Sequence, residues 1–283
     1  MKEALTPTQS PIQEIRLLVL DIDGTIAGIS NDIREPVLKA IKAVQEKGIR
    51  VAIATGRMYR SALRFHEAIR SDLPLMSYQG ALIKDPVDQK IYRHWPVLIP
   101  TALQLLNHFE QGELRQLLSV HFYINDQLYV REITPETRIY AERSGVEAIA
   151  VGDLRQVLTD EPTKVLALSD DVDLIDRLFG NLRKQYTPAE LYLTKSVATF
   201  FEATNPEVNK GTAVRYLAEE MLGLRAEQVM TVGDNFNDLE MLQYAGIGVA
   251  MGEAPEDVKA QANWVAPGVE EDGVVAAIEK FLL

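Results

Sequence analysis

The chain has 283 residues, 47% of them hydrophobic and 25% charged, a composition typical of an ordinary folded protein. At about 150 residues per domain, this length predicts about two domains. The 41 acidic and 29 basic side chains give a formal net charge of −12. That charge disfavours nucleic acid or an anionic membrane surface as a general partner. The absence of cysteine excludes disulfides, thiolate catalysis and cysteine-ligated metal centres.

Histidine chemistry and membrane insertion are not expected either. The four histidines are scattered and show no metal-ligand spacing, so neither a histidine metal site nor a histidine-based triad is predicted. Residues 1–14 form a polar leader without the apolar run of a signal peptide, and no segment approaches the length of a membrane span. These features lead us to expect a cytoplasmic protein.

The first part of the chain alternates predicted strands and helices. Residues 15–22 are mostly apolar and end in an Asp-Gly-Thr turn, which predicts a buried parallel strand. A helix follows, for which Asn31 or Asp32 is the expected cap and Gly48 the expected end. Residues 49–54 predict a second strand. Two further elements are expected, a helix that contains Ala62, Phe65 and Ile69 and a strand over residues 75–83.

The last part of the chain repeats this alternation. Helices are expected over 210–222, 238–244, 255–262 and 273–283, and strands over 228–232, 247–250 and 263–266. Strands that alternate with helices indicate a mostly parallel sheet, as in Rossmann-like α/β folds.

The middle of the chain has a different pattern. Strands are expected over 121–125 and 128–132, with helices over 101–109 and 172–184. We therefore predict an α/β core domain over residues 15–84 and 206–283, with an α+β domain inserted over residues 85–205.

Polar residues cluster where three of the predicted core strands end and where one helix begins. The clusters are Asp21-Ile22-Asp23-Gly24-Thr25, Thr55-Gly56-Arg57, Gly233-Asp234-Asn235-Phe236-Asn237-Asp238 and Asn209-Lys210-Gly211. Ligands bind beyond the carboxyl ends of strands in open parallel sheets. Each cluster alone is more often a turn or a helix cap. Their joint occurrence favours a site, and the four aspartates offer the oxygen ligands that Mg²⁺ prefers.

These four clusters resemble the four motifs of the haloacid dehalogenase superfamily, and most closely its Cof-type sugar phosphatase branch. The resemblance covers residues 15–84 and 206–283 and implies that the inserted α+β domain is a cap. Two positions depart from the branch. Gln79 stands where an asparagine is usual, and Phe236 stands where a small or polar residue is common.

The resemblance implies a role for each motif residue. Asp21 would be the nucleophile and Asp23 the general acid and base, with Mg²⁺ as the cofactor. The implied metal ligands are Asp21, the Asp23 carbonyl, Asp234 and, through water or from a second layer, Asp238. The implied phosphate-binding residues are Thr55, Gly56, Lys210 and Asn237, of which Thr55 and Lys210 also act in catalysis. Five residues of the inserted domain are candidates for substrate contact: His121, Tyr123, Tyr129, Arg131 and Lys195.

The implied function is a Mg²⁺-dependent phosphatase that hydrolyses monoesters of small metabolites, with sugar phosphates as the expected substrates, through an aspartyl-phosphate. A sucrose-phosphate or phosphoglycerate-type phosphatase and a phosphomutase are alternatives with the same chemistry. A phosphate-ligand sensor and a dinucleotide-binding protein are alternatives from other classes, although Gly246, Gly248 and Gly252 match the dinucleotide fingerprint poorly. The expected partner is a small phosphorylated metabolite, with no nucleic acid or membrane, and the expected state is a monomer or small homo-oligomer.

Overall fold

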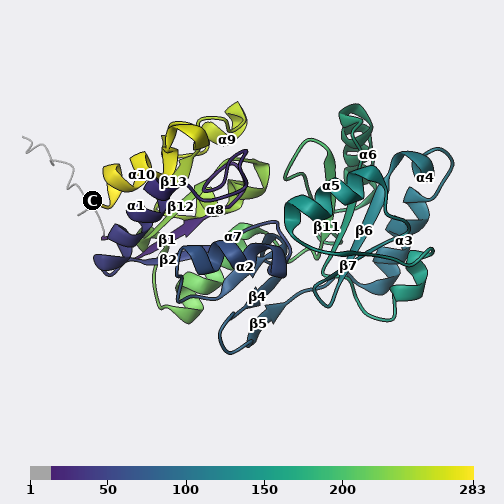
Figure 1. Cartoon of the computed structure of the whole chain (residues 1–283), viewed down its shortest axis with the longest axis horizontal. Coiled ribbons are helices and arrows are strands. Elements are labelled where there is room, and N and C mark those ends of the chain that lie inside the picture. Colours follow the sequence, from purple (N-terminus) through teal and green to yellow (C-terminus); the bar gives the residue numbers. More distant parts are fainter. Residues whose placement is uncertain (1–13) are drawn as a thin grey trace, which may run out of the picture.

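The computed structural model describes residues 14–283, which form two parts that lie side by side (Figure 1). The first part is built on a parallel sheet with the strand order β14-β13-β12-β1-β2. Its strands are β1 (Leu17–Leu20), β2 (Arg50–Ile53), β12 (Val229–Gly233), β13 (Ile247–Ala250) and β14 (Trp264–Val265). Segments from both ends of the chain therefore meet in one sheet, because β1 pairs with β12.

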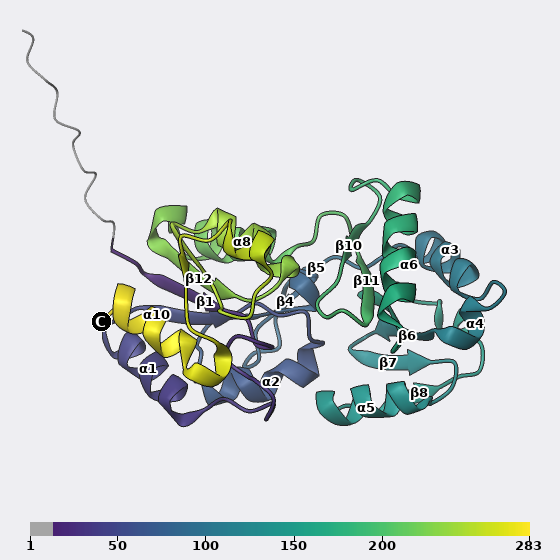
Figure 2. The same ribbon diagram turned by 90° about the horizontal axis from the view of Figure 1, so that it is seen from above.

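Helices cover both faces of this sheet (Figure 2). One face packs against α1 (Glu35–Glu46), α2 (Tyr59–Ala68) and α10 (Gly273–Phe281). The other packs against α7 (Lys210–Arg215), which continues as a π-helix over Tyr216–Met221, and against α8 (Leu239–Tyr244) and α9 (Glu256–Lys259). Side chains of β1 alternate between the two cores, with Leu18 and Leu20 on one side and Leu17 and Val19 on the other.

Two local predictions for this part are wrong. Helix α1 starts at Glu35, and neither Asn31 nor Asp32 caps it, because Arg34 takes the N-cap position without a side-chain bond. The strand expected over 75–83 reverses direction in its middle. It is β3 (Leu75–Ser77), a turn over Tyr78–Gly80 and β4 (Leu82–Lys84), which also pairs with β5 (Ile91–His94). All three turn residues have positive φ, which ends an extended strand.

The second part is a six-stranded sheet with the order β10-β11-β9-β6-β7-β8. Its strands are β6 (Ser119–Ile124), β7 (Gln127–Val130), β8 (Ala148–Ala150), β9 (Lys164–Leu168), β10 (Tyr192–Thr194) and β11 (Phe200–Thr204). Its helices are α3 (Ile99–Phe109), α4 (Leu114–Leu117), α5 (Pro135–Ser144) and α6 (Val172–Gln185). The predicted fold class, a parallel α/β core with an inserted α+β part, is confirmed. The domain boundaries stay a prediction.

The period of two along strand β9 decides which residues face the first part. Val165 and Ala167 pack in one core with α3 and α6, whereas Leu166 and Leu168 belong to the core that continues into the first part. Lys164 is two residues before Leu166 and therefore lies on the same face of the strand, which faces the space between the two parts. Within residues 14–283, no helix is long and apolar enough to span a membrane.

Candidate active site

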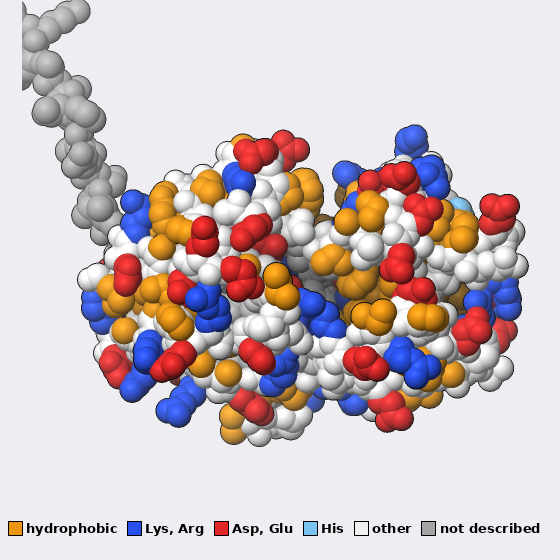
Figure 3. Space-filling view, turned by 45° about the horizontal axis from the view of Figure 1, so that its top comes forward, with side chains coloured by type: hydrophobic (Ala, Val, Ile, Leu, Met, Phe, Trp, Pro, Cys, Tyr) orange, Lys and Arg blue, Asp and Glu red, His pale blue; other side chains and the backbone are white. Residues whose placement is uncertain are grey.

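A cleft of about 560 Å³ lies between the two parts, at the carboxyl ends of β1, β2 and β12 (Figure 3). The first part lines it with Asp21, Asp23, Gly24, Thr55, Gly56, Arg57, Asp234, Asn235 and Asn237. The second part lines it with Glu136, Ile139, Tyr140, Arg143, Ser144, Lys164, Leu168, Asp170, Ser196, Val197, Thr199 and Phe200. Three of the four sequence clusters therefore meet at one edge of the sheet.

The fourth cluster does not line the cleft, but its Lys210 contacts Asp21, which does. Its ammonium lies 2.6 Å from Asp21 Oδ1 and 2.6 Å from Asp238 Oδ1, and its side chain is fully buried. Although burial acts to lower the pKa of Lys210, the charges of Asp21 and Asp238 raise it. Asp238 Oδ2 accepts hydrogen bonds from the backbone N–H groups of Asp234 and Asn235. Both oxygens of Asp238 are thus engaged, one by Lys210 and one by the loop after β12.

Three carboxylates at this edge of the sheet form a group that could hold a divalent cation. Oxygens of Asp21, Asp234 and Asp238 lie within 4.8 Å of one another. Burial raises the pKa of Asp21 to about 7 against the opposing effect of Lys210, and burial together with the charges of Asp238 and Asp21 raises that of Asp234 to about 9. Buried carboxylates of this kind need a cation to stay ionised. Asp21 and Asp234 are the direct ligand candidates, because the oxygens of Asp238 already accept hydrogen bonds.

Gly24 allows Asp234 to take its place in this cluster. A Cβ at position 24 would lie 2.2 Å from Asp234 Oδ2, and the residue has a φ of +77°. Both the space and the backbone conformation therefore favour glycine at this position.

Asp23 is held by Arg57. The guanidinium donates two hydrogen bonds to the carboxylate, at 2.7 and 2.6 Å, and Arg143 of helix α5 lies 3.9 Å away. Burial acts to raise the pKa of Asp23, but the bonds and charge of Arg57 lower it below the ordinary value. Asn31 links the two arginines, since it accepts a bond from the Arg57 side chain and donates one to the Arg143 carbonyl.

The other predicted phosphate-binding residues lie beside this pair. Thr55 is buried, and its hydroxyl accepts a hydrogen bond from the Arg57 N–H at 3.1 Å. Gly56 packs against Gln79, so a Cβ there would lie 2.4 Å from Gln79 Nε2. Asn237 donates from Nδ2 to Gln79 Oε1 at 3.1 Å. The structure thus brings every residue that the four clusters predict for catalysis, metal binding or phosphate binding to the cleft or to its floor.

The residues of the second part that line the cleft are not the ones considered from the sequence. His121 and Tyr123 are buried, and Tyr129 packs against the core that β9 shares with α3 and α6. Arg131 pairs with Glu132, and Lys195 pairs with Asp176. None of these five side chains lines the cleft as the structure describes it.

Helix α5 instead presents one face to the cleft. Glu136, Ile139, Tyr140 and Arg143 are spaced at three, four and seven residues, which places them on one side of a helix. The sequence did contain a signal for this helix, with Pro135 in the first turn and Gly145 just after the end. The predicted elements of the middle segment nevertheless left it out.

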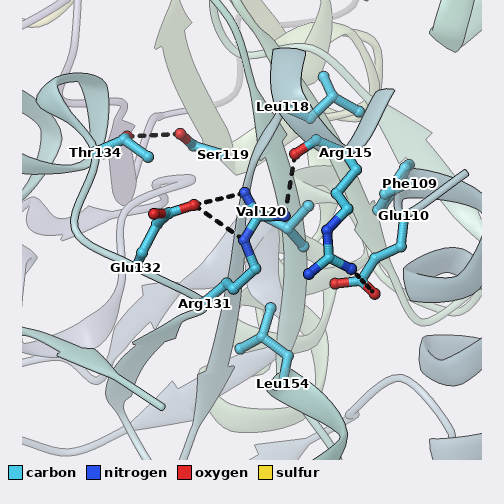
Figure 4. A pocket seen from close by; sticks show the side chains of 10 residues that line it. All are labelled: Phe109, Glu110, Arg115, Leu118, Ser119, Val120, Arg131, Glu132, Thr134 and Leu154. Atoms are coloured by element: carbon cyan, nitrogen blue, oxygen red, sulfur yellow. Dashed lines mark hydrogen bonds and ion pairs between the residues drawn. The ribbon is translucent and has the colours of Figure 1, made fainter. Parts of the chain in front are cut away.

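A second hollow, on the far side of the inserted sheet, is too small for a metabolite (Figure 4). Its volume is about 10 Å³, which is about the space of one water molecule. Its charges are also paired, because Arg115 and Arg155 both contact Glu110, and Arg131 contacts Glu132.

Comparison with known proteins identifies relatives over most of the chain. A family model described as haloacid dehalogenase-like hydrolase matches residues 18–278. A 5-amino-6-(5-phospho-D-ribitylamino)uracil phosphatase of Bacillus subtilis is 29% identical over 273 residues, which are 94% of this chain and 97% of that protein. A phosphoglycolate phosphatase of Methanoculleus marisnigri is 27% identical over 280 residues, covering 94% and 97% of the two chains. The crystal structure of a haloacid dehalogenase-like hydrolase from Bacteroides thetaiotaomicron matches with a TM-score of 0.82 at 25% identity, over 94% of this chain and 99% of that one.

Proposed function

Because the chain belongs to the haloacid dehalogenase-like hydrolases and the two relatives described above are named phosphatases, we propose that it hydrolyses phosphate monoesters of small metabolites through a phosphorylated Asp21. The observation that carries the proposal is the contact of the buried Lys210 ammonium with Asp21 at the floor of the cleft. A carboxylate in this position is held still, and the charge beside it stabilises negative charge that develops during transfer.

In the first step, an Asp21 oxygen attacks phosphorus, and the bond from phosphorus to the leaving oxygen breaks. Asp23 gives its proton to that leaving oxygen. Both oxygens of Asp23 accept bonds from Arg57, so Asp23 has to separate from Arg57 to carry this proton.

In the second step, water attacks phosphorus, and the bond from phosphorus to Asp21 breaks. Asp23 accepts the proton that the water loses, and the two steps together convert ester and water into alcohol and phosphate. The deprotonated Asp23 that Arg57 holds is the form this step needs. Thr55 and the Gly56 N–H would donate to the phosphoryl oxygens, and both residues line the cleft.

The donor set supports Mg²⁺ as the cofactor. The side chains of Asp21 and Asp234, with the Asp23 carbonyl, would hold the ion, and Asp238 would support them by fixing the loop and Lys210. When bound, the ion supplies positive charge that offsets the repulsion between the nucleophile and the phosphoryl oxygens.

The charges of the inserted part favour an uncharged, hydroxyl-rich leaving group such as a sugar or polyol. Glu136 and Asp170 line the cleft as hydrogen-bond acceptors. Among the described cleft residues of the inserted part, the two cations are Lys164, which is bound by Glu202, and Arg143, which lies 3.9 Å from Asp23. A second phosphate or a carboxylate on the leaving group would face these two carboxylates. The two relatives are named for different substrates, so we infer the substrate class from the residues that line the cleft.

Phosphate release from a panel of esters tests the proposal. The panel contains glucose 6-phosphate, a polyol phosphate, phosphoglycolate and 3-phosphoglycerate, each with Mg²⁺ and with EDTA, for wild type and Asp21→Asn. We expect release that requires Mg²⁺, is lost in the variant and is fastest with the sugar or polyol phosphates. Absence of release from folded wild type, or equal rates in Asp21→Asn, would overturn the phosphatase mechanism. Preference for phosphoglycolate would overturn the substrate class alone.

A further inference from the structure

A chain of buried polar side chains connects the inserted part to the floor of the cleft. Lys164 of β9 donates to Glu202 Oε2 at 2.8 Å, and Gln79 Nε2 lies 3.5 Å from the same oxygen. Gln79 Oε1 in turn accepts from Asn237 Nδ2 at 3.1 Å. Lys164, Glu202, Gln79 and Asn237 are each at most 4% exposed. Four polar side chains at this depth hold their positions through these bonds.

The backbone fixes Gln79 firmly beside the phosphate-binding loop. Its φ is +62°, between Tyr78 and Gly80, which also have positive φ. Its N–H donates to the Thr55 carbonyl at 2.9 Å, and its side chain fills the space beside Gly56. A non-glycine residue in the left-handed region costs conformational energy, so local packing and bonding have to hold it there.

The charge of Glu202 determines how the Gln79 amide is turned. A carboxylate only accepts hydrogen bonds, so Gln79 directs its NH₂ group toward Glu202 and its oxygen toward Asn237. Asn237 therefore donates one of its side-chain N–H groups to Gln79. Among the described residues its Oδ1 has no hydrogen-bond partner, and Asn237 lines the cleft.

These four hydrogen-bonded side chains connect the two parts of the molecule. Lys164 and Glu202 belong to the inserted sheet, whereas Gln79 and Asn237 belong to the core. Lys164 also donates to the Gly56 carbonyl at 2.9 Å, so the ion pair contacts the core at two places. Movement of the inserted sheet away from the core would break both contacts together.

We propose that Gln79 is a positioning residue, which transmits the placement of the inserted part to the amide of Asn237 and so makes Asn237 competent only when the cleft is closed. The inference rests on the proposed phosphatase function. The buried Oδ1 of Asn237, an acceptor without a partner among the described residues, is suited to a water molecule or a substrate hydroxyl rather than to an unprotonated phosphoryl oxygen. Loss of Gln79 should therefore slow turnover more than it weakens substrate binding.

Gln79→Met tests this with p-nitrophenyl phosphate, because it keeps the length of the side chain and removes the amide. Gln89→Met is the matched control, since Gln89 has the same φ of +62° on an exposed turn. We expect Gln79→Met to lower kcat by about tenfold with KM changed less than about threefold, and Gln89→Met to change neither. Asn237→Ala should lower kcat similarly, and the double variant no further. Unchanged kcat in Gln79→Met, or effects that multiply in the double variant, would overturn the proposal.

A second measurement does not depend on turnover. The side-chain amide signal of Asn237 in the NMR spectrum should shift in Glu202→Gln, because Glu202 contacts Gln79 and Gln79 contacts Asn237, and should stay in place in Gln89→Met. An unmoved signal in folded Glu202→Gln would contradict the coupling, even if Gln79→Met did not fold. Failure of the phosphatase function would instead appear as wild type without phosphate release, with this signal still responding to Glu202→Gln.

Discussion

Lys210 donates a 2.6 Å hydrogen bond to Asp21 across 189 positions of sequence, at a depth where the lysine is fully buried. The contact exists because β1 and β12 are neighbours in the sheet and helix α7 packs beside them. It joins the first of the predicted clusters, at Asp21, to the fourth, at Lys210.

Lys210→Met should abolish most of the activity and also destabilise the fold. Two buried carboxylates, Asp21 and Asp238, would lose their shared cation, and breaking a buried pair typically costs about 3–5 kcal/mol. The loss of a charge beside the transferring group should lower kcat by about 100-fold or more. Steady-state kinetics and urea unfolding measure the two effects. Lys259→Met, which removes a partly exposed pair with Glu256, is the control. Near-normal turnover in Lys210→Met would contradict this role.

Asp234→Asn should raise the Mg²⁺ concentration needed for half-maximal activity by at least about tenfold. The variant removes one of the two carboxylates with oxygens free for the ion, while the loop stays fixed by Asp238. Titration of EDTA-treated enzyme with Mg²⁺ gives this concentration. Asp257→Asn, in the first turn of α9, serves as the control. An unchanged requirement in Asp234→Asn would exclude it as a ligand.

Glu136→Lys should shift the preference of the enzyme toward leaving groups that carry a carboxylate. The substitution replaces a negative charge in the cleft with a positive one, and we expect the kcat/KM ratio of phosphoglycolate to glucose 6-phosphate to rise about tenfold. Glu142→Lys, which makes the same change on an exposed position of α5 outside the cleft, should leave the ratio unchanged. Equal shifts in both variants would indicate a general charge effect instead of a contact with substrate.

The stability of the protein should fall as pH drops from 6.5 to 5, in part because of His121. Burial, with the charge of Lys164, lowers the pKa of His121 to about 3, so the folded state stays neutral where the unfolded state binds a proton. The unfolded state is therefore favoured by up to about 1.4 kcal/mol per pH unit below 6.5. His121→Gln should show a shallower decline in urea unfolding between these pH values. His108→Gln, on a half-buried position of α3, is the comparison, and parallel curves for His121→Gln and wild type would refute the prediction.

The core strands and the motif loops could be predicted from sequence because their signals are local. Residues 15–22 combine an apolar run with a turn, and the strand β1 and the cluster after it appear where that pattern indicates. Parallel sheets also bring strand ends together, so Asp21, Thr55 and Asp234 could be assigned to one edge before their contacts were known.

The features that could not be predicted depend on contacts between distant residues. The reversal at Gln79 is held by the Thr55 carbonyl and by Asn237, neither of which is near it in sequence. Lys164 and Glu202 look like ordinary alternating positions of two strands, and their meeting depends on the pairing of β9 with β11. Helix α5 was missed because its polar and exposed residues give only a weak apolar stripe.

Detection of the phosphorylated enzyme tests the central claim most directly. Asp23→Ala, which lacks the proposed base, is mixed with Mg²⁺ and with acetyl phosphate that carries a radioactive label on its phosphoryl group. The leaving group of acetyl phosphate needs no acid. The protein is then quenched in acid and digested with a protease. We predict a label that hydroxylamine releases, carried by the peptide that contains Asp21 and absent from the Asp21→Asn/Asp23→Ala double variant. A label that persists without Asp21, or no label on a protein that still consumes acetyl phosphate, would contradict the mechanism.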